Sequence, residues 1–144
     1  MSSPELDNLV KICKLKRDPA SPRELEGLRE SALARLTDAG QGSLSFDSRF
    51  DLAYNAAHAL ALYALRRLGY RSDNRYVVFQ ALPHTAGLPP EIWRVLAKAH
   101  ERRNLAEYEG HLEHDEPLVS GLIAAATRLR TAVETLPPPT DHAT

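Results

Sequence analysis

Hydrophobic residues recur at helical spacing along most of the chain. Leucines and alanines over residues 25–36 follow one another by three or four positions, the spacing of one buried face of an α-helix. The same spacing continues over residues 50–68, a segment rich in alanine, and again over residues 118–136. The alanines allow neighbouring helices to approach closely, so the segment 50–68 is expected to be the central helix of a bundle. The pattern therefore predicts an all-α fold.

Capping residues mark where these helices begin and end. Serine followed by proline, at residues 3–4 and 21–22, combines an N-cap acceptor with the preferred first helical residue. Gly40, Gly69 and Gly110 follow apolar runs and are typical of helix C-termini. Together these signals predict helices over about residues 4–16, 22–39, 47–68, 76–82, 90–109 and 117–136.

The segment 76–82 is the least certain element of this prediction. Its Val77-Val78-Phe79 run is also typical of a β-strand, and Pro83 ends or kinks a helix. Helix is favoured because no partner strand is visible elsewhere in the chain. We therefore expect a single domain over residues 1–136, built as a bundle of four to six helices, and a disordered proline-rich tail over residues 137–144.

Composition narrows the function classes. The chain has 144 residues, 43% hydrophobic and 26% charged, with a net charge of −1, so nucleic-acid binding would need a local basic patch. A single cysteine, Cys13, excludes an intramolecular disulfide. No signal-peptide pattern and no apolar run of about 20 residues is present. These features predict a cytoplasmic protein that does not enter the membrane.

Polar chemistry is concentrated late in the predicted helix over residues 90–109. Arg102, Arg103, Asn104 and Tyr108 lie within about two turns, with Asn104 and Tyr108 on one helix face. Arginine can grip phosphate, asparagine can contact a base edge and tyrosine can stack on a base. The alternative is an ordinary solvated face, with an intrahelical Arg103–Glu107 pair and a half-buried tyrosine.

A second polar group interrupts the alanine-rich helix. Asp51, Tyr54, Asn55 and His58 are spaced so that they share one face. They are candidate substrate-binding residues, together with Arg102, if they line the same cleft as Arg103. Interhelical hydrogen bonding that fixes the packing register is the equally weighted alternative, because buried polar groups need partners.

Metal and cofactor chemistry have little support. Glu107, His111, His114 and Asp115 are closely spaced, but Gly110 should end the helix and separate their faces. No glycine-rich phosphate loop or nucleophile motif is present. We expect neither a metal nor a cofactor.

Three segments resemble the HEPN family (higher eukaryotes and prokaryotes nucleotide-binding): the alanine-rich helix from Arg49 to His58, Gly69-Tyr70-Arg71, and Arg103-Asn104-Leu105-Ala106-Glu107-Tyr108. The resemblance covers roughly Ser45 to Leu136. It implies an up-and-down helical bundle, commonly dimeric, with the arginine motif in a cleft at or near the dimer interface.

The resemblance also implies a function. Many HEPN proteins are metal-independent ribonucleases, often toxins paired with a nucleotidyltransferase-like antitoxin, and their motif is an arginine followed within a few residues by a histidine. Arg103 takes the arginine place and Asn104 the polar place after it, so Arg103, Asn104 and Tyr108 are the candidate catalytic residues. Tyr108 stands where the histidine is expected, and a tyrosine, with a pKa near ~10, is a poor proton shuttle at neutral pH.

The sequence therefore favours an RNA- or nucleotide-binding homodimer that is a catalytically weakened component of a toxin–antitoxin pair. The first alternative is an active ribonuclease in which His58 or His84 replaces the missing histidine. The second is a helical protein–protein interaction module that binds no nucleic acid.

Overall fold

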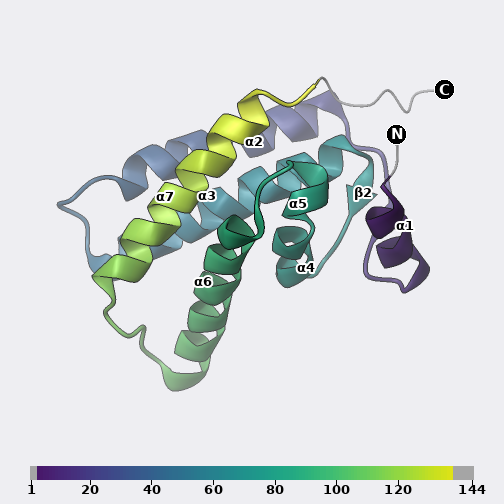
Figure 1. Cartoon of the computed structure of the whole chain (residues 1–144). Helices are drawn as coiled ribbons and strands as arrows, with labels where there is room; N and C mark the ends of the chain where they lie inside the picture. Colours follow the sequence, from purple (N-terminus) through teal and green to yellow (C-terminus); the bar gives the residue numbers. More distant parts are fainter. Residues whose placement is uncertain (1–2, 138–144) are drawn as a thin grey trace.

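The structure, a computed structural model of the whole chain, describes residues 3–137 and is almost entirely helical (Figure 1). The predicted disordered tail lies outside the described residues, apart from Pro137. The elements in chain order are α1 (Pro4–Lys11), β1 (Lys16–Arg17), α2 (Pro22–Ala39), α3 (Phe46–Arg67), β2 (Tyr70–Arg71), α4 (Arg75–Gln80), α5 (Leu82–Thr85), α6 (Pro90–Glu109) and α7 (Glu116–Glu134). The all-α prediction is confirmed.

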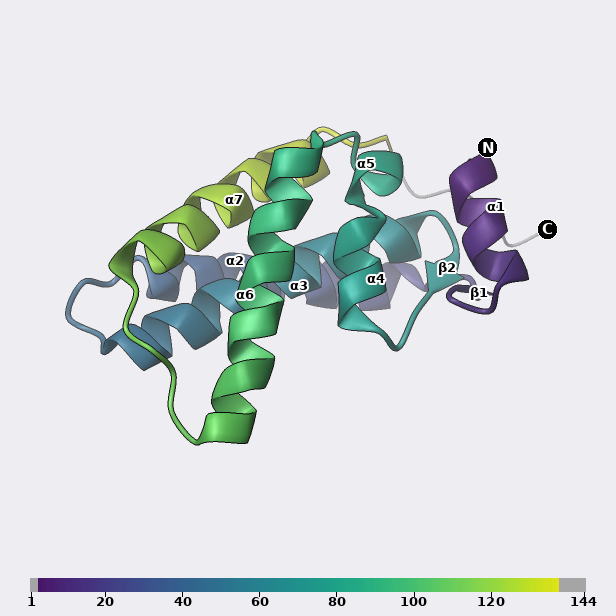
Figure 2. The ribbon, with the colours of Figure 1, turned by 60° about the horizontal axis from the view of Figure 1, so that its bottom comes forward.

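Helix α3 is the centre of the bundle, as its alanine-rich sequence predicts. Helices α2 and α7 pack along it, and α4, α5 and α6 cover its remaining side (Figures 1 and 2). Leu60, in the middle of α3, is only 1% exposed. Six of the helix's alanines are also buried, which lets the neighbouring helices approach its backbone closely: Ala53, Ala56, Ala57, Ala59, Ala61 and Ala64.

The predicted caps at Ser3 and Ser21 are confirmed, because each side chain accepts a hydrogen bond from a backbone N–H of the first turn of its helix. Helix α3 is capped by Ser45, slightly ahead of the predicted start. Gly69 and Gly110 both have the left-handed backbone expected after a helix, with φ of 85° and 84°.

The first helix ends at Lys11, five residues earlier than predicted. The chain turns at Cys13, whose φ is 62°, and Lys16–Arg17 then pairs antiparallel with Tyr70–Arg71. Leu6 and Leu15 explain the turn: nine residues apart, they would lie on opposite faces of a continuous helix. The turn brings both side chains into the core.

The described residues form seven helices, one more than the predicted upper limit. The additional helix arises in the predicted segment 76–82, which is divided into α4 and α5 at Ala81. Pro83 explains the division because it has no N–H to bond the carbonyl oxygen of Phe79 and continue the helical ladder.

A buried arginine ties the short strands to the bundle. Arg66, near the end of α3, donates from Nε to Glu24 Oε2 over 2.6 Å and also bonds the carbonyl oxygens of Asp18 and Tyr70. The hydrogen bond from Arg66 holds the pKa of Glu24 below its ordinary value. One guanidinium thus connects α2, α3 and both strands.

Candidate functional site

A hydrogen-bonded chain of three side chains joins α3 to α6. Tyr54 of α3 is completely buried, and its hydroxyl lies 2.8 Å from Nδ1 of His100 on α6. The amide nitrogen of Asn104, one turn further along α6, lies 3.2 Å from Nε2 of the same ring. Both ring nitrogens of His100 are therefore engaged, and its orientation is fixed from both sides.

Two guanidinium groups lie against the Tyr54 ring. The guanidinium carbon of Arg75, from α4, is 5.5 Å from the ring centroid, and that of Arg103, from α6, is 5.2 Å away. Arg103 pairs with Glu107 at 3.2 Å, whereas Arg75 donates to the Asn55 amide oxygen and has no carboxylate partner among residues 3–137. Two cations around one ring, only one of them paired, make this part of the surface electropositive.

Histidines in this region are neutral near pH 7. Burial, reinforced by the positive charges of Arg75, His100 and Arg103, lowers the pKa of His58 to about 4. Burial and the same two arginines also lower the pKa of His100, against a small opposing effect of Glu101. His58 lies edge-on to Phe79 with ring centroids 5.9 Å apart. No hydrogen bond joins its ring nitrogens to another described residue.

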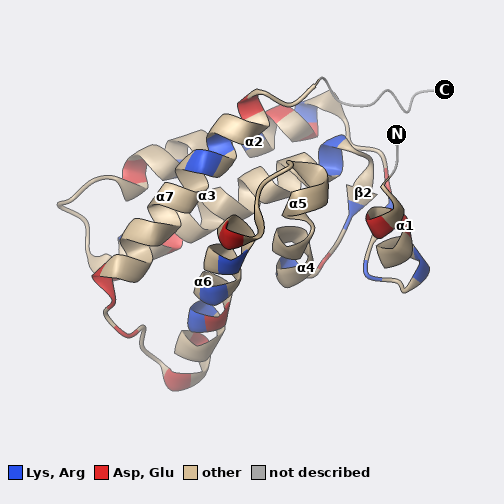
Figure 3. Ribbon diagram, in the orientation of Figure 1, with Lys and Arg blue, Asp and Glu red and all other residues tan. Residues whose placement is uncertain are grey.

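We refer to these six side chains as the Tyr54–His100 cluster: Tyr54, His58, Arg75, His100, Arg103 and Asn104. Figure 3 shows several basic residues along the middle of α6, with acidic residues beside them and towards both ends of that helix.

Arg103 also borders an open hollow of about 310 Å³. The hollow lies between the start of α3 and the end of α6, and its wall carries Asp47, Phe50, Asp51, Arg103, Ala106, Glu107, Gly110, His111 and Leu112. Arg103 is the only member of the cluster in this wall, which places it between the cluster and the hollow.

Most of the predicted site residues come together. Arg103 and Asn104 of the arginine motif meet Tyr54 and His58, and Asn55 is linked to the group through Arg75. The two polar groups, one on α3 and one on α6, are therefore in contact, and the Tyr54–His100 contact is an interhelical hydrogen bond of the kind that the alternative interpretation expects. The Arg103–Glu107 pair of the alternative interpretation is present as well.

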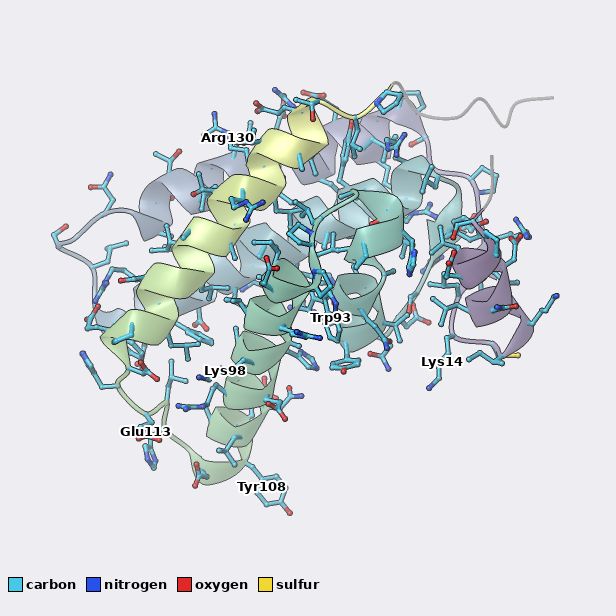
Figure 4. The ribbon with its side chains drawn as sticks, viewed as in Figure 1. Lys14, Trp93, Lys98, Tyr108, Glu113 and Arg130 are labelled. Carbon is cyan, nitrogen blue, oxygen red and sulfur yellow. The ribbon has the colours of Figure 1, made fainter. Side chains whose placement is uncertain are left out.

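Three predicted residues do not join the cluster. Tyr108 is 94% exposed and points away from the far end of α6 (Figure 4). Arg102 faces the loop before α7, where it lies 3.8 Å from Asp115 and 3.9 Å from Glu113. Asp51 lies in the wall of the hollow.

His84, the alternative replacement for the missing histidine, is also elsewhere. It lies in α5, 3.8 Å from Glu5 of α1. Of the two histidines considered, only His58 lies in the cluster.

Two cluster residues were not predicted. His100 precedes Asn104 by four residues on one helix face, so its spacing could have revealed it. Arg75 gave no comparable signal, because it begins a short helix whose position relative to α3 depends on the packing of the whole bundle.

Metal ligation and membrane insertion find no support among residues 3–137. No three histidine, cysteine or acidic side chains in that range lie close enough together to hold a metal ion. His114 instead stacks on Phe46 and pairs with Glu116. No helix in the same range has the length and apolar character required to cross a bilayer.

Comparisons with protein-family models, with curated proteins and with solved structures find no match to this chain. The functional argument therefore depends on the residues of the cluster themselves.

Proposed function

We propose that this HEPN-like chain binds RNA or a nucleotide through a phosphate group held at the Tyr54–His100 cluster. The observation that carries the proposal is the pair of guanidiniums around Tyr54, of which Arg75 has no anionic partner among the described residues. A phosphate would supply the missing negative charge, and guanidinium groups can bind it in a forked, two-point contact.

The neighbouring histidines suit the same ligand. A neutral imidazole can donate or accept a hydrogen bond, and Asn104 adds an amide group at the edge of the cluster. The positive charges that lower the pKa values of His58 and His100 would be offset by a bound phosphate. Binding should therefore raise both pKa values, a signature that non-specific surface binding would not give.

The test is a titration of the protein with short single-stranded RNA. Arg75→Ala and Arg103→Ala should each weaken binding about 10- to 100-fold, the range for losing one charged hydrogen-bonded contact. Arg130→Ala is the matched control, because Arg130 is exposed on α7 and pairs only with Glu134. If the wild type does not bind RNA, or if Arg103→Ala changes only the melting temperature, the cluster is structural and the proposal fails.

A metal-independent ribonuclease is the second candidate function, and His58 favours it. A neutral histidine beside two arginines could accept the 2′-hydroxyl proton while the arginines stabilise charge on the phosphate. Its pKa of about 4 makes it a weak base, so binding is the first proposal. Cleavage of RNA in the presence of a chelator, abolished by His58→Gln, would favour the ribonuclease.

The resemblance to HEPN proteins extends the proposal to assembly. We infer a cytoplasmic homodimer that is one component of a toxin–antitoxin pair with a nucleotidyltransferase-like partner. Leu105 and Tyr108 support a contact surface, because both are exposed near the end of α6 that projects from the bundle (Figure 2). A monomer in sedimentation equilibrium at micromolar concentration would contradict the homodimer. A neighbouring gene of the nucleotidyltransferase class would support the pairing.

The remaining alternative is a protein–protein interaction module that binds no nucleic acid. The alanine-rich face of α3, the surface first expected to bind a partner, is buried inside the bundle, so such a module would need another surface. This alternative predicts no binding of RNA or phosphate at Arg103. The titration described above therefore separates it from the first proposal.

A further inference from the structure

An exposed aromatic ring lies directly beside the proposed phosphate site. Tyr76 follows Arg75 in α4, and 38% of its surface is exposed. Its ring meets that of Trp93 nearly perpendicularly, at 88° and a centroid separation of 6.1 Å. The His100 ring is 6.5 Å away on the cluster side. Tyr76 is thus held by aromatic neighbours while part of its ring remains accessible.

This arrangement places a flat apolar ring next to a phosphate-binding group. Arg75 and Tyr76 are consecutive, so the cation and the ring are held by the same short helix and cannot move far apart. A nucleotide has the same pairing of parts, a flat base joined through a sugar to a phosphate. The His100 ring links the two parts, because it lies 6.5 Å from the Tyr76 ring and belongs to the cluster that carries Arg75 and Arg103.

We propose that Tyr76, supported by Trp93, is the stacking platform for an unpaired base of a single-stranded nucleic acid whose phosphate lies at Arg75 and Arg103. This inference rests on the proposed function and deepens it, because it names the class of ligand. Proteins commonly bind single strands by stacking bases on exposed aromatic side chains beside a positively charged groove. A base paired within a duplex does not offer its face in this way.

Charge around the platform selects against an uncharged partner. Arg75 precedes Tyr76 in the same helix, and its guanidinium carbon lies 5.5 Å from the Tyr54 ring centroid. Arg103 adds a second cation to the same cluster, 5.2 Å from the Tyr54 ring centroid. An apolar peptide would gain nothing from these cations, whereas a polyanion with flat bases would use both the charge and the ring.

The experiment uses the intrinsic fluorescence of Trp93, which is the only tryptophan in the chain. The full-length protein is titrated with inorganic phosphate, with a short single-stranded RNA, with DNA of the same sequence, and with the RNA in duplex form. The variants are Tyr76→Leu, which removes the ring, and Tyr76→Phe, which keeps it. Tyr108→Leu is the matched control, because Tyr108 is a 94% exposed tyrosine with no hydrogen bond or ring contact to a cluster side chain.

Single-stranded nucleic acid should change the Trp93 emission and bind more tightly than inorganic phosphate. Tyr76→Leu should lower that affinity about 5- to 100-fold, the range for losing one stacked base, while Tyr76→Phe stays within about twofold of wild type. Phosphate affinity should not change in either variant. A preference for RNA or DNA in the paired titrations identifies which single strand is the ligand, since both offer the same stacking chemistry.

Several results would overturn the inference. Equal affinity of Tyr76→Leu and wild type for the single strand would exclude stacking, and so would duplex binding as tight as single-strand binding. Competition by poly-glutamate as effective as that by RNA would show that the site recognises charge alone. In each of these cases the phosphate site still stands. If wild type binds neither phosphate nor oligonucleotide, the proposed function fails and this inference fails with it.

Discussion

The hydroxyl of Tyr54 lies 2.8 Å from Nδ1 of His100, and this contact joins the central helix to the helix that carries the arginine motif. The amide nitrogen of Asn104 faces Nε2 of the same ring, so Nε2 is the acceptor and Nδ1 carries the proton. If the His100 ring were protonated, its Nε2–H would face the N–H of the Asn104 amide, and two donors would oppose each other. The geometry and the lowered pKa of His100 therefore both favour a neutral imidazole.

Removing the Tyr54 hydroxyl tests whether this contact matters for stability. Tyr54→Phe leaves the His100 Nδ1–H without its acceptor in a buried place. It should lower the free energy of unfolding by about 1–2 kcal/mol in urea denaturation. Tyr63→Phe is the control, because Tyr63 is a half-buried tyrosine of the same helix whose hydroxyl bonds no other described residue. Equal losses in the two variants would show that the contact contributes nothing specific.

The lowered pKa of His58 predicts a dependence of stability on pH. The pKa falls from 6.5 to about 4 on folding, so between these values the unfolded chain binds a proton that the folded chain does not. The contribution of His58 to stability is therefore complete above pH 6.5 and is lost as the pH falls towards 4. The loss should reach at most about 3 kcal/mol.

The measurement is urea unfolding of wild type and His58→Gln between pH 4.5 and pH 7. The difference in unfolding free energy between the two proteins should shrink as the pH falls, because only wild type loses the His58 contribution. His111→Gln, at an exposed position, should follow the wild-type curve. If the unfolding free energies of wild type and His58→Gln depend on pH in the same way, the surroundings of His58 do not lower its pKa.

The core prediction compares two leucines. Leu60 is 1% exposed in the middle of α3, so Leu60→Ala should cost about 2–5 kcal/mol through lost burial and the cavity left behind. Leu105 is 51% exposed on α6, so Leu105→Ala should change stability by less than about 0.5 kcal/mol. Chemical denaturation of both variants measures these losses. If Leu60→Ala loses as little unfolding free energy as Leu105→Ala, this face of α3 is wrongly assigned to the core.

Local patterns predicted the helices because each depends on a short stretch of sequence. The apolar repeat of α3 and the cap at Ser21 are properties of neighbouring residues, and both are found where expected. The break at Ala81 follows from Pro83, which was expected to end or kink the helix, whereas the turn at Cys13 was missed, because it depends on Leu6 and Leu15 both packing into the core.

In the candidate site, too, sequence spacing predicted the neighbours within one helix but not the contacts that depend on long-range packing. The spacing within α3 and within α6 placed Tyr54 with His58 and Arg103 with Asn104, and the bundle brings the two pairs together. No sequence rule places Arg75 over the Tyr54 ring, because that contact needs the position of α4. Composition also gave no hint of the buried bonds from Arg66 to Glu24 and Asp18, which lie more than 40 residues away along the chain.

Tyr108 provides the sharpest contrast between the sequence motif and the geometry. The resemblance drawn from the sequence puts it at the place of a histidine, yet it is 94% exposed, whereas Asn104, one turn earlier, contacts His100. Tyr108→Ala and Tyr108→His should therefore leave RNA affinity within about twofold of wild type, since an exposed surface position contributes little. Asn104→Ala should weaken binding several-fold, because it removes both a contact and the support of the His100 ring.

Neither Tyr108 variant should cleave RNA in the presence of chelator. Cleavage by Tyr108→His would instead show that a histidine at position 108 reaches the phosphate bound beside Arg103, and this prediction would then be wrong.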